Sequence, residues 1–226
     1  MYKIFVLLGL SAALLSGCQA PAPPAKPLVQ ANLSVRYLGP ERSLRGQATF
    51  FRGDSLATAT PLDLPGGVSF MGSGMDKRTL PGNVIRYSSS MISPPTSPLR
   101  FAFRLDPEAS LREIEVNWTP IDSFAVVSGS LAEGLVFTFS GGLQETEELL
   151  LLFSDANREA RTILIPGPIS RRQYLVPANA LADFAAGPYQ LYLVKKSNTS
   201  REVDPGFIVH ESLEYYSEEV AFELGE

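Results

Sequence analysis

The chain of 226 residues contains one histidine, His210, and this limits the chemistry that its side chains can do. A Ser-His-Asp arrangement would have to use His210, which lies in an alternating segment, 207–210, typical of a strand. The Gly-x-Ser-x-Gly sequence of a nucleophile elbow is absent, since the stretch from Gly67 ends in Met71. Zinc needs several nitrogen or sulfur ligands, which one histidine cannot supply. We therefore expect His210 to be structural or exposed, and we expect no catalytic residue, no metal site and no cofactor.

Carboxylates are the second group that could do chemistry. Glu145, Glu147 and Glu148 lie close together in the sequence, and so do Glu218 and Glu219. Two converging acids could serve glycoside hydrolysis, and several could bind calcium, but no Asp-rich loop has the calcium spacing. A solvated strand end or turn explains both clusters, so an envelope hydrolase is the least supported alternative.

Aromatic rings are candidates for stacking against a sugar. The residues in question are Trp118, Tyr215 and Tyr216. Neighbouring residues of a strand point to opposite faces, so we expect one of the two tyrosines to be exposed. These three rings are the candidate contacts of a glycan-binding or other ligand-binding protein.

Cys18 is the only cysteine, so the chain has no intramolecular disulfide and no thiolate metal site. It follows Lys3 and an apolar run over residues 4–15, which is typical of a secretory signal and too short to span a bilayer. Leu15-Ser16-Gly17-Cys18 resembles the lipobox of bacterial lipoproteins. The resemblance implies cleavage before Cys18, a diacylglyceryl thioether on its sulfur and an acylated amino group. The alternative is an ordinary secretory signal with an incidental cysteine.

The residues after Cys18 bear on its location in the cell envelope. The resemblance to lipoproteins implies a stable membrane anchor, because more than one acyl chain is attached. Gln19 stands where an aspartate would imply retention in the inner membrane, so the outer membrane is favoured. Residues 19–27 are rich in Ala and Pro, are typical of a semi-rigid spacer and contain no acidic run, which favours the periplasmic face.

Composition limits the kinds of molecule that the folded part of the chain can bind. The formal net charge is −5, which argues against nucleic acid and against an anionic membrane face as electrostatic partners. Hydrophobic residues make up 45% of the chain, which is enough for a real core.

Alternation of apolar and polar residues predicts many short strands separated by Gly- and Pro-rich turns. The clearest strands are expected at 32–38, 99–105, 110–118, 135–140 and 189–195. Residues 177–184 are the one helical candidate, because a Pro stands at the first position and Gly187-Pro188 follows. The pattern predicts an all-β protein built from β-sandwiches.

We expect two sandwich domains in tandem. The predicted parts are a signal peptide at 1–17, the lipidated cysteine and a Pro-rich linker at 18–31, a first sandwich at 32–122 and a second at 123–226. Asp183-Phe-Ala-Ala-Gly187-Pro-Tyr189-Gln-Leu191 resembles the tyrosine corner of immunoglobulin-like sandwiches. The resemblance implies that the hydroxyl of Tyr189 bonds back to the upstream backbone, and says nothing about activity. The expected fold is therefore two immunoglobulin-like β-sandwich domains in tandem.

One predicted strand breaks the alternation. Residues 149–153 read Leu-Leu-Leu-Leu-Phe, so Leu150 and Leu152 point away from the side that Leu149 and Leu151 fill. The outer face of an antiparallel sheet is normally polar. We therefore expect this face to be covered by the first domain, by the helical segment near Leu181 or by a partner.

These observations favour a membrane-anchored lipoprotein of the bacterial envelope that is a non-catalytic interaction or structural module. The main alternative is a lipoprotein that binds glycans or another ligand. An envelope protein or a glycan is the expected partner, besides the membrane itself.

Overall fold

The computed structural model describes residues 28–53, 58–121 and 123–226. Cys18, the signal segment and the linker up to residue 27 lie outside the described residues. The described chain confirms the all-β prediction, because its helical elements are two single turns, η1 (Pro81–Asn83) and η2 (Ala178–Leu181). The helix predicted at 177–184 is therefore wrong in type, since the segment forms one 3₁₀ turn, and so short a segment gains little from helix propagation.

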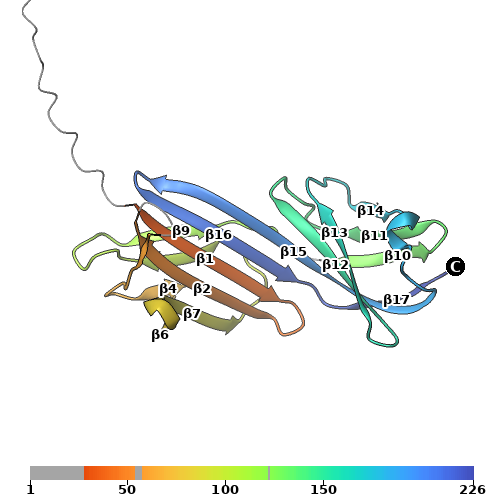
Figure 1. Cartoon of the computed structure of the whole chain (residues 1–226), viewed down its shortest axis with the longest axis horizontal. Coiled ribbons are helices and arrows are strands. Elements are labelled where there is room, and N and C mark those ends of the chain that lie inside the picture. The colour runs from red at the N-terminus through yellow and green to blue at the C-terminus, as the bar shows by residue number, and fades with distance from the viewer. Residues whose placement is uncertain (1–27, 54–57, 122) are drawn as a thin grey trace, which may run out of the picture.

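A ten-stranded sheet runs through the whole molecule, and two smaller sheets pack against its two ends (Figure 1). At the first end it contains β1 (Val29–Leu38), β2 (Ser43–Arg52), β3 (Thr60–Pro61), β6 (Asp76–Thr79), β7 (Ile85–Ile92) and β16 (Phe207–Tyr216). The small sheet there contains β4 (Val68–Phe70), β5 (Ser73–Gly74), β8 (Leu99–Phe103) and β9 (Arg112–Val116).

The second end of the long sheet contains β12 (Glu147–Asp155), β13 (Ala160–Pro166) and β17 (Val220–Leu224). Facing them is a sheet of three strands, β10 (Phe124–Ser130), β11 (Gly134–Phe139) and β14 (Gln173–Val176). Each end of the molecule is thus a β-sandwich, and the two sandwiches lie one after the other along the long axis (Figure 1).

One strand, β15 (Gly187–Asp204), belongs to both sandwiches. Its first part pairs with β12 and β17, and its last part, from Val194 onward, pairs with β16. Its 18 residues span about 56 Å at the usual rise of a strand. Because the strand is continuous, its backbone hydrogen bonds tie the two sandwiches together.

Strand pairing does not follow the predicted division of the chain into sandwiches at 32–122 and 123–226. β16 lies in the range assigned to the second domain, yet it pairs in parallel with β1 over ten residues of each strand. Residues 198–216 therefore belong to the first sandwich. The chain crosses from the first sandwich to the second near residue 121 and returns through β15, a path that local alternation does not reveal.

Aromatic side chains fill the first sandwich between its sheets. The ring centroids of Phe50 and Phe103 are 4.7 Å apart, and those of Phe70 and Phe101 also lie 4.7 Å apart. Gly46 of β2 leaves room for Phe70, since a Cβ atom there would lie 2.7 Å from the ring. The buried apolar side chains of both sandwiches form one continuous cluster.

Tyr189 makes the hydrogen bond that the tyrosine corner implies. Its hydroxyl donates to the carbonyl oxygen of Ala185 over 3.1 Å and accepts a hydrogen bond from the amide of Ala185 over 3.3 Å. The ring is buried beside Phe222, to which it stacks with centroids 5.8 Å apart. Tyr189 thus fixes the turn that leads into β15.

The apolar strand β12 has one filled face and one half-covered face. Leu149, Leu151 and Phe153 are buried, whereas Leu150 and Leu152 are half-buried. Leu150 lies in register with the buried Val194 of β15 and with Leu164 of β13, which is 55% exposed. The turn η2 contacts β11 of the opposite sheet, so the cover of this face comes from neighbouring strands and not from the segment near Leu181.

Candidate functional site

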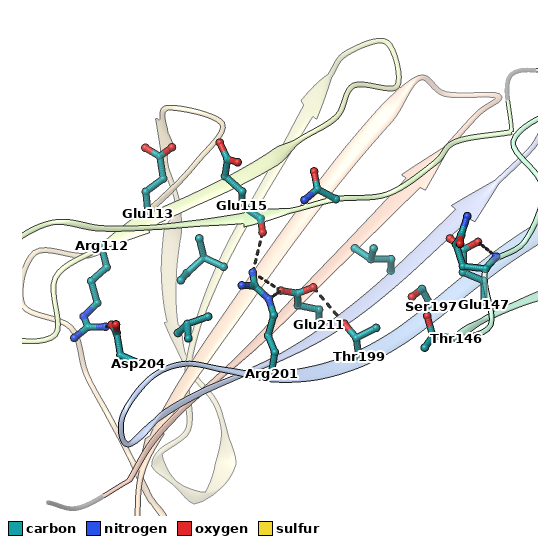
Figure 2. A pocket seen from close by; sticks show the side chains of 15 residues that line it. Arg112, Glu113, Glu115, Thr146, Glu147, Ser197, Thr199, Arg201, Asp204 and Glu211 are labelled. Carbon is teal, nitrogen blue, oxygen red and sulfur yellow. Dashed lines mark hydrogen bonds and ion pairs between the residues drawn. The ribbon is translucent and has the colours of Figure 1, made fainter.

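A charged groove of about 840 Å³ runs along one side of the first sandwich. It lies between β9 and the last part of β15, with β16 beneath it (Figure 2). In the described chain, β9 pairs only with β8, and residues 198–204 of β15 pair only with β16. The groove is therefore bounded by two sheet edges.

Strand alternation places the groove's polar groups. Ser197, Thr199 and Arg201 share one face of β15, and Glu211 shares the inner face of β16 with the buried Leu213. Polar residues at inward positions are tolerated here because the groove admits water between the sheets.

Arg201 is the centre of the groove's interactions (Figure 2). Its Nε donates to Oε1 of Glu211 over 2.9 Å, and its Nη2 donates to the carbonyl oxygen of Glu115 over 2.9 Å. The hydroxyl of Thr199 donates to the other oxygen of Glu211. At the end of the groove Arg112 pairs with Asp204. These bonds join the two sheets, and they pair each arginine with a carboxylate. Charged side chains along an open strand edge also discourage it from pairing with another chain.

A buried ion pair closes the inner end of the groove, at the junction of the sandwiches. Lys195 is 4% exposed, and its ammonium lies 2.9 Å from Oε2 of Glu147. It also donates to the carbonyl oxygens of Thr119 and Gly142, each over 3.0 Å. Glu147 accepts a further bond from the amide of Gln144. All three donors of the ammonium are used, so this group holds the crossing chain and is not free to act on a substrate.

Three groups outside the groove, Tyr87, Asp63 and Asp155, have pKa values shifted in directions that do not suit general acid catalysis. Burial raises the pKa of Tyr87 to about 12. Its hydroxyl donates to Asp63, and the bonds from Lys77 and Tyr87 lower the pKa of that carboxyl. Amide donors, that of Glu159 first, lower the pKa of Asp155. A general acid needs a raised carboxyl pKa, whereas these shifts keep tyrosine neutral and the carboxylates charged.

The three predicted contact aromatics do not form an exposed platform. Trp118 and Tyr215 are 8% and 7% exposed, and their ring centroids lie 5.5 Å apart inside the molecule. The hydroxyl of Tyr215 donates to the carbonyl oxygen of Ile121, and the indole of Trp118 donates to that of Thr96. Both rings therefore pack the junction, and the expectation that they contact a ligand is corrected.

Tyr216 points to the opposite face of β16, as expected for the neighbour of Tyr215, and is partly exposed. The guanidinium of Arg36 lies 5.6 Å from the centre of its ring. One face of the ring is thus taken by an internal contact.

The predicted acidic clusters separate in the structure. Glu147 is buried in its ion pair, Glu145 is exposed, and Glu218 and Glu219 are exposed. His210 lies on the outer face of β16, and its Nε2 is buried without a hydrogen-bond partner among the described residues.

Lys195 is not among the predicted site residues, although the strand predicted at 189–195 contains one signal for it. Tyr189, Leu191 and Leu193 recur at every second position, and the same alternation places Lys195 on their side of the strand. A lysine at an apolar register position indicates a buried partner. The identity of that partner, Glu147, depends on the pairing of β12 with β15.

Comparisons with known proteins give no assignment. No family model matches the chain, and no curated protein matches it significantly. Within the described residues, no helix is long and apolar enough to cross a membrane, and no group of three or more His, Cys, Asp or Glu side chains could hold a metal ion.

Proposed function

We propose that this protein is a lipid-anchored, non-catalytic interaction module of the bacterial cell envelope. Cys18 carries the anchor, the Ala- and Pro-rich linker forms a short spacer, and the folded body presents its surface away from the bilayer. The outer membrane, on its periplasmic side, is the favoured location.

The observation that carries this proposal is the shared strand β15. Val29, where β1 begins, donates to the carbonyl oxygen of Gly206 in the turn between β15 and β16. That turn is the end of the first sandwich far from the second (Figure 1). A tether that enters β1 would hold the far part of the second sandwich, where β15 begins, about 56 Å away, the length of β15.

Two features support a non-catalytic role. The groove's arginines are paired internally, and the one histidine of the chain has no acid bonded to its Nε2. Such pairs stabilise the sandwich edge and leave no free acid and base facing one another, which general acid–base catalysis requires. The immunoglobulin-like character of the second sandwich belongs to the same proposal, supported by the hydrogen bond of Tyr189.

The test is membrane fractionation of the full chain in a bacterial host that processes lipoproteins. Cys18→Ser should move the protein from the membrane to the soluble fraction or leave it unprocessed, because the acylated sulfur is lost. Gln19→Ser is the matched control and should stay in the membrane fraction. Mass spectrometry of the wild-type N-terminal peptide should show attached acyl chains. A wild-type protein without lipid, or equal membrane retention of Cys18→Ser, would contradict the anchor.

A further inference from the structure

The outer face of the long sheet, over the first sandwich, carries a row of small polar side chains. Their neighbours along each strand, such as Leu33, Val35 and Ala48, are buried, so alternation points the polar residues outward. Strand register places six of them side by side across six strands: Asn198, Ser212, Ser34, Gln47, Ser88 and Asp76. Five of these six are uncharged hydrogen-bonding groups.

A second row lies two residues further along the same strands and contains cations. Register aligns Ser200, His210, Asn32, Thr49, Arg86 and Arg78. We call the two rows together the polar strip. With strands about 4.8 Å apart, the strip is about 24 Å long.

The side chains of the polar strip are not engaged with one another. No side-chain hydrogen bond or ion pair joins any of the twelve to another described residue, although all are at least partly exposed. The Nε of Arg86 and the Nε2 of His210 are buried and unpartnered. These two nitrogen atoms have almost no accessible surface, so the exposed polar atoms of the strip are the ones that are open to a partner from outside the chain. The groove at β9 and β15 differs, since its arginines are paired.

The charges of the strip indicate the kind of partner. Arg78 and Arg86 lie directly opposite one another on β6 and β7. Like charges in this position destabilise a sheet unless an anion lies between them. Guanidinium groups bind carboxylates through two parallel hydrogen bonds, and hydroxyl and amide side chains suit sugar hydroxyls. The strip thus carries two arginines and one aspartate, Asp76, at one end, is uncharged along the rest of its length apart from His210, and lies on a chain with net charge −5.

We propose that the polar strip binds an extended acidic polysaccharide, a glycan chain that carries carboxylate groups. The chain lies across the strands, with a carboxylate between Arg78 and Arg86 and sugar hydroxyls on Gln47, Ser34 and Asn198. This names the partner of the proposed interaction module. Binding by purified protein does not depend on the anchor, so failure of Cys18 acylation and failure of this inference are separate results.

A membrane surface fits the strip less well. Peripheral membrane binding uses apolar side chains that enter the acyl boundary beside clustered basic residues. Neither row of the strip contains an apolar side chain, and only two lysine or arginine residues occur in it. The strip matches a partner that offers many hydroxyl groups together with carboxylates.

The experiment measures binding of the full chain, purified in detergent, to alginate, polygalacturonate and hyaluronan, with dextran as the neutral polymer. Wild-type protein should bind at least one acidic polysaccharide, more weakly as salt is raised, and should bind dextran less. Arg86→Gln should weaken binding by about tenfold, the equivalent of about 1.4 kcal/mol. Gln47→Glu with Ser88→Glu should abolish it, because added carboxylates repel the ligand.

Control variants place a charge change of the same sign off the strip. Arg171 is exposed and has no ion pair among the described residues, so Arg171→Gln should bind like wild type, as should Ser170→Glu. Far-UV circular dichroism of each variant checks that the fold is retained. No binding to any of the three acidic polymers, or equal losses in the Arg171→Gln and Arg86→Gln variants, would overturn the proposal. Binding to phosphatidylglycerol vesicles alone, through Arg86, would overturn it in favour of a membrane surface.

Discussion

Lys195 shows how one side chain fixes the crossing between the two sandwiches. Its ammonium bonds to β12 through Glu147, to the crossing chain through Thr119 and to a turn of the second sandwich through Gly142. Breaking a buried pair leaves a charge without compensation, which costs far more than the intact pair contributes.

Removing the ammonium should therefore be strongly destabilising. Lys195→Met leaves the carboxylate of Glu147 buried with one amide donor, and we expect a loss of about 3–5 kcal/mol in the free energy of unfolding by chemical denaturation. Adding Glu147→Gln to that variant should recover part of the loss, because no charge then stays buried. Lys196→Met is the control and should change stability by about 0.5 kcal/mol or less, since that side chain is partly exposed. Equal stability of the Lys195→Met protein and wild type would contradict this role.

Among the elements, β15 shows what local pattern could and could not predict. Its first part is predicted from the sequence because Tyr189, Leu191 and Leu193 recur at every second position. Its extension to Asp204 is not, because residues 197–202 are polar on both faces, one toward water and one toward the groove. The pairing of β1 with β16 joins residues 178 positions apart, and no local signal encodes it. The polar strip follows from that pairing and was equally hidden.

The outer face of β12 offers a prediction at the same scale. Leu150 and Leu152 are half-buried against neighbouring strands, so Leu150→Lys with Leu152→Lys should lower the free energy of unfolding by about 2 kcal/mol, part of the full burial of two leucines. Thr162→Lys, exposed on the next strand, is the control and should have little effect. Chemical denaturation measures both. A double variant as stable as wild type would show that this face gains nothing from its neighbours.

For the whole molecule, the shared strand and the continuous core make the two sandwiches one folding unit. The crossing chain is held on both sides: Lys195 binds the carbonyl of Thr119, and Tyr215 binds that of Ile121. The only tryptophan, Trp118, is packed at this junction and reports on it by fluorescence. Two sandwiches joined by a flexible linker would instead open independently.

The prediction is a single unfolding transition shared by both sandwiches. Trp118 fluorescence and far-UV circular dichroism should give coincident denaturation curves, the mark of two-state unfolding. Leu99→Ala in the first sandwich and Leu135→Ala in the second, both fully buried, should each cost about 2–5 kcal/mol and shift both curves together. If either substitution moved one probe and left the other in place, the sandwiches would unfold separately. β15 would then link two independent domains, and the body could not hold the second sandwich at a fixed distance from its anchor.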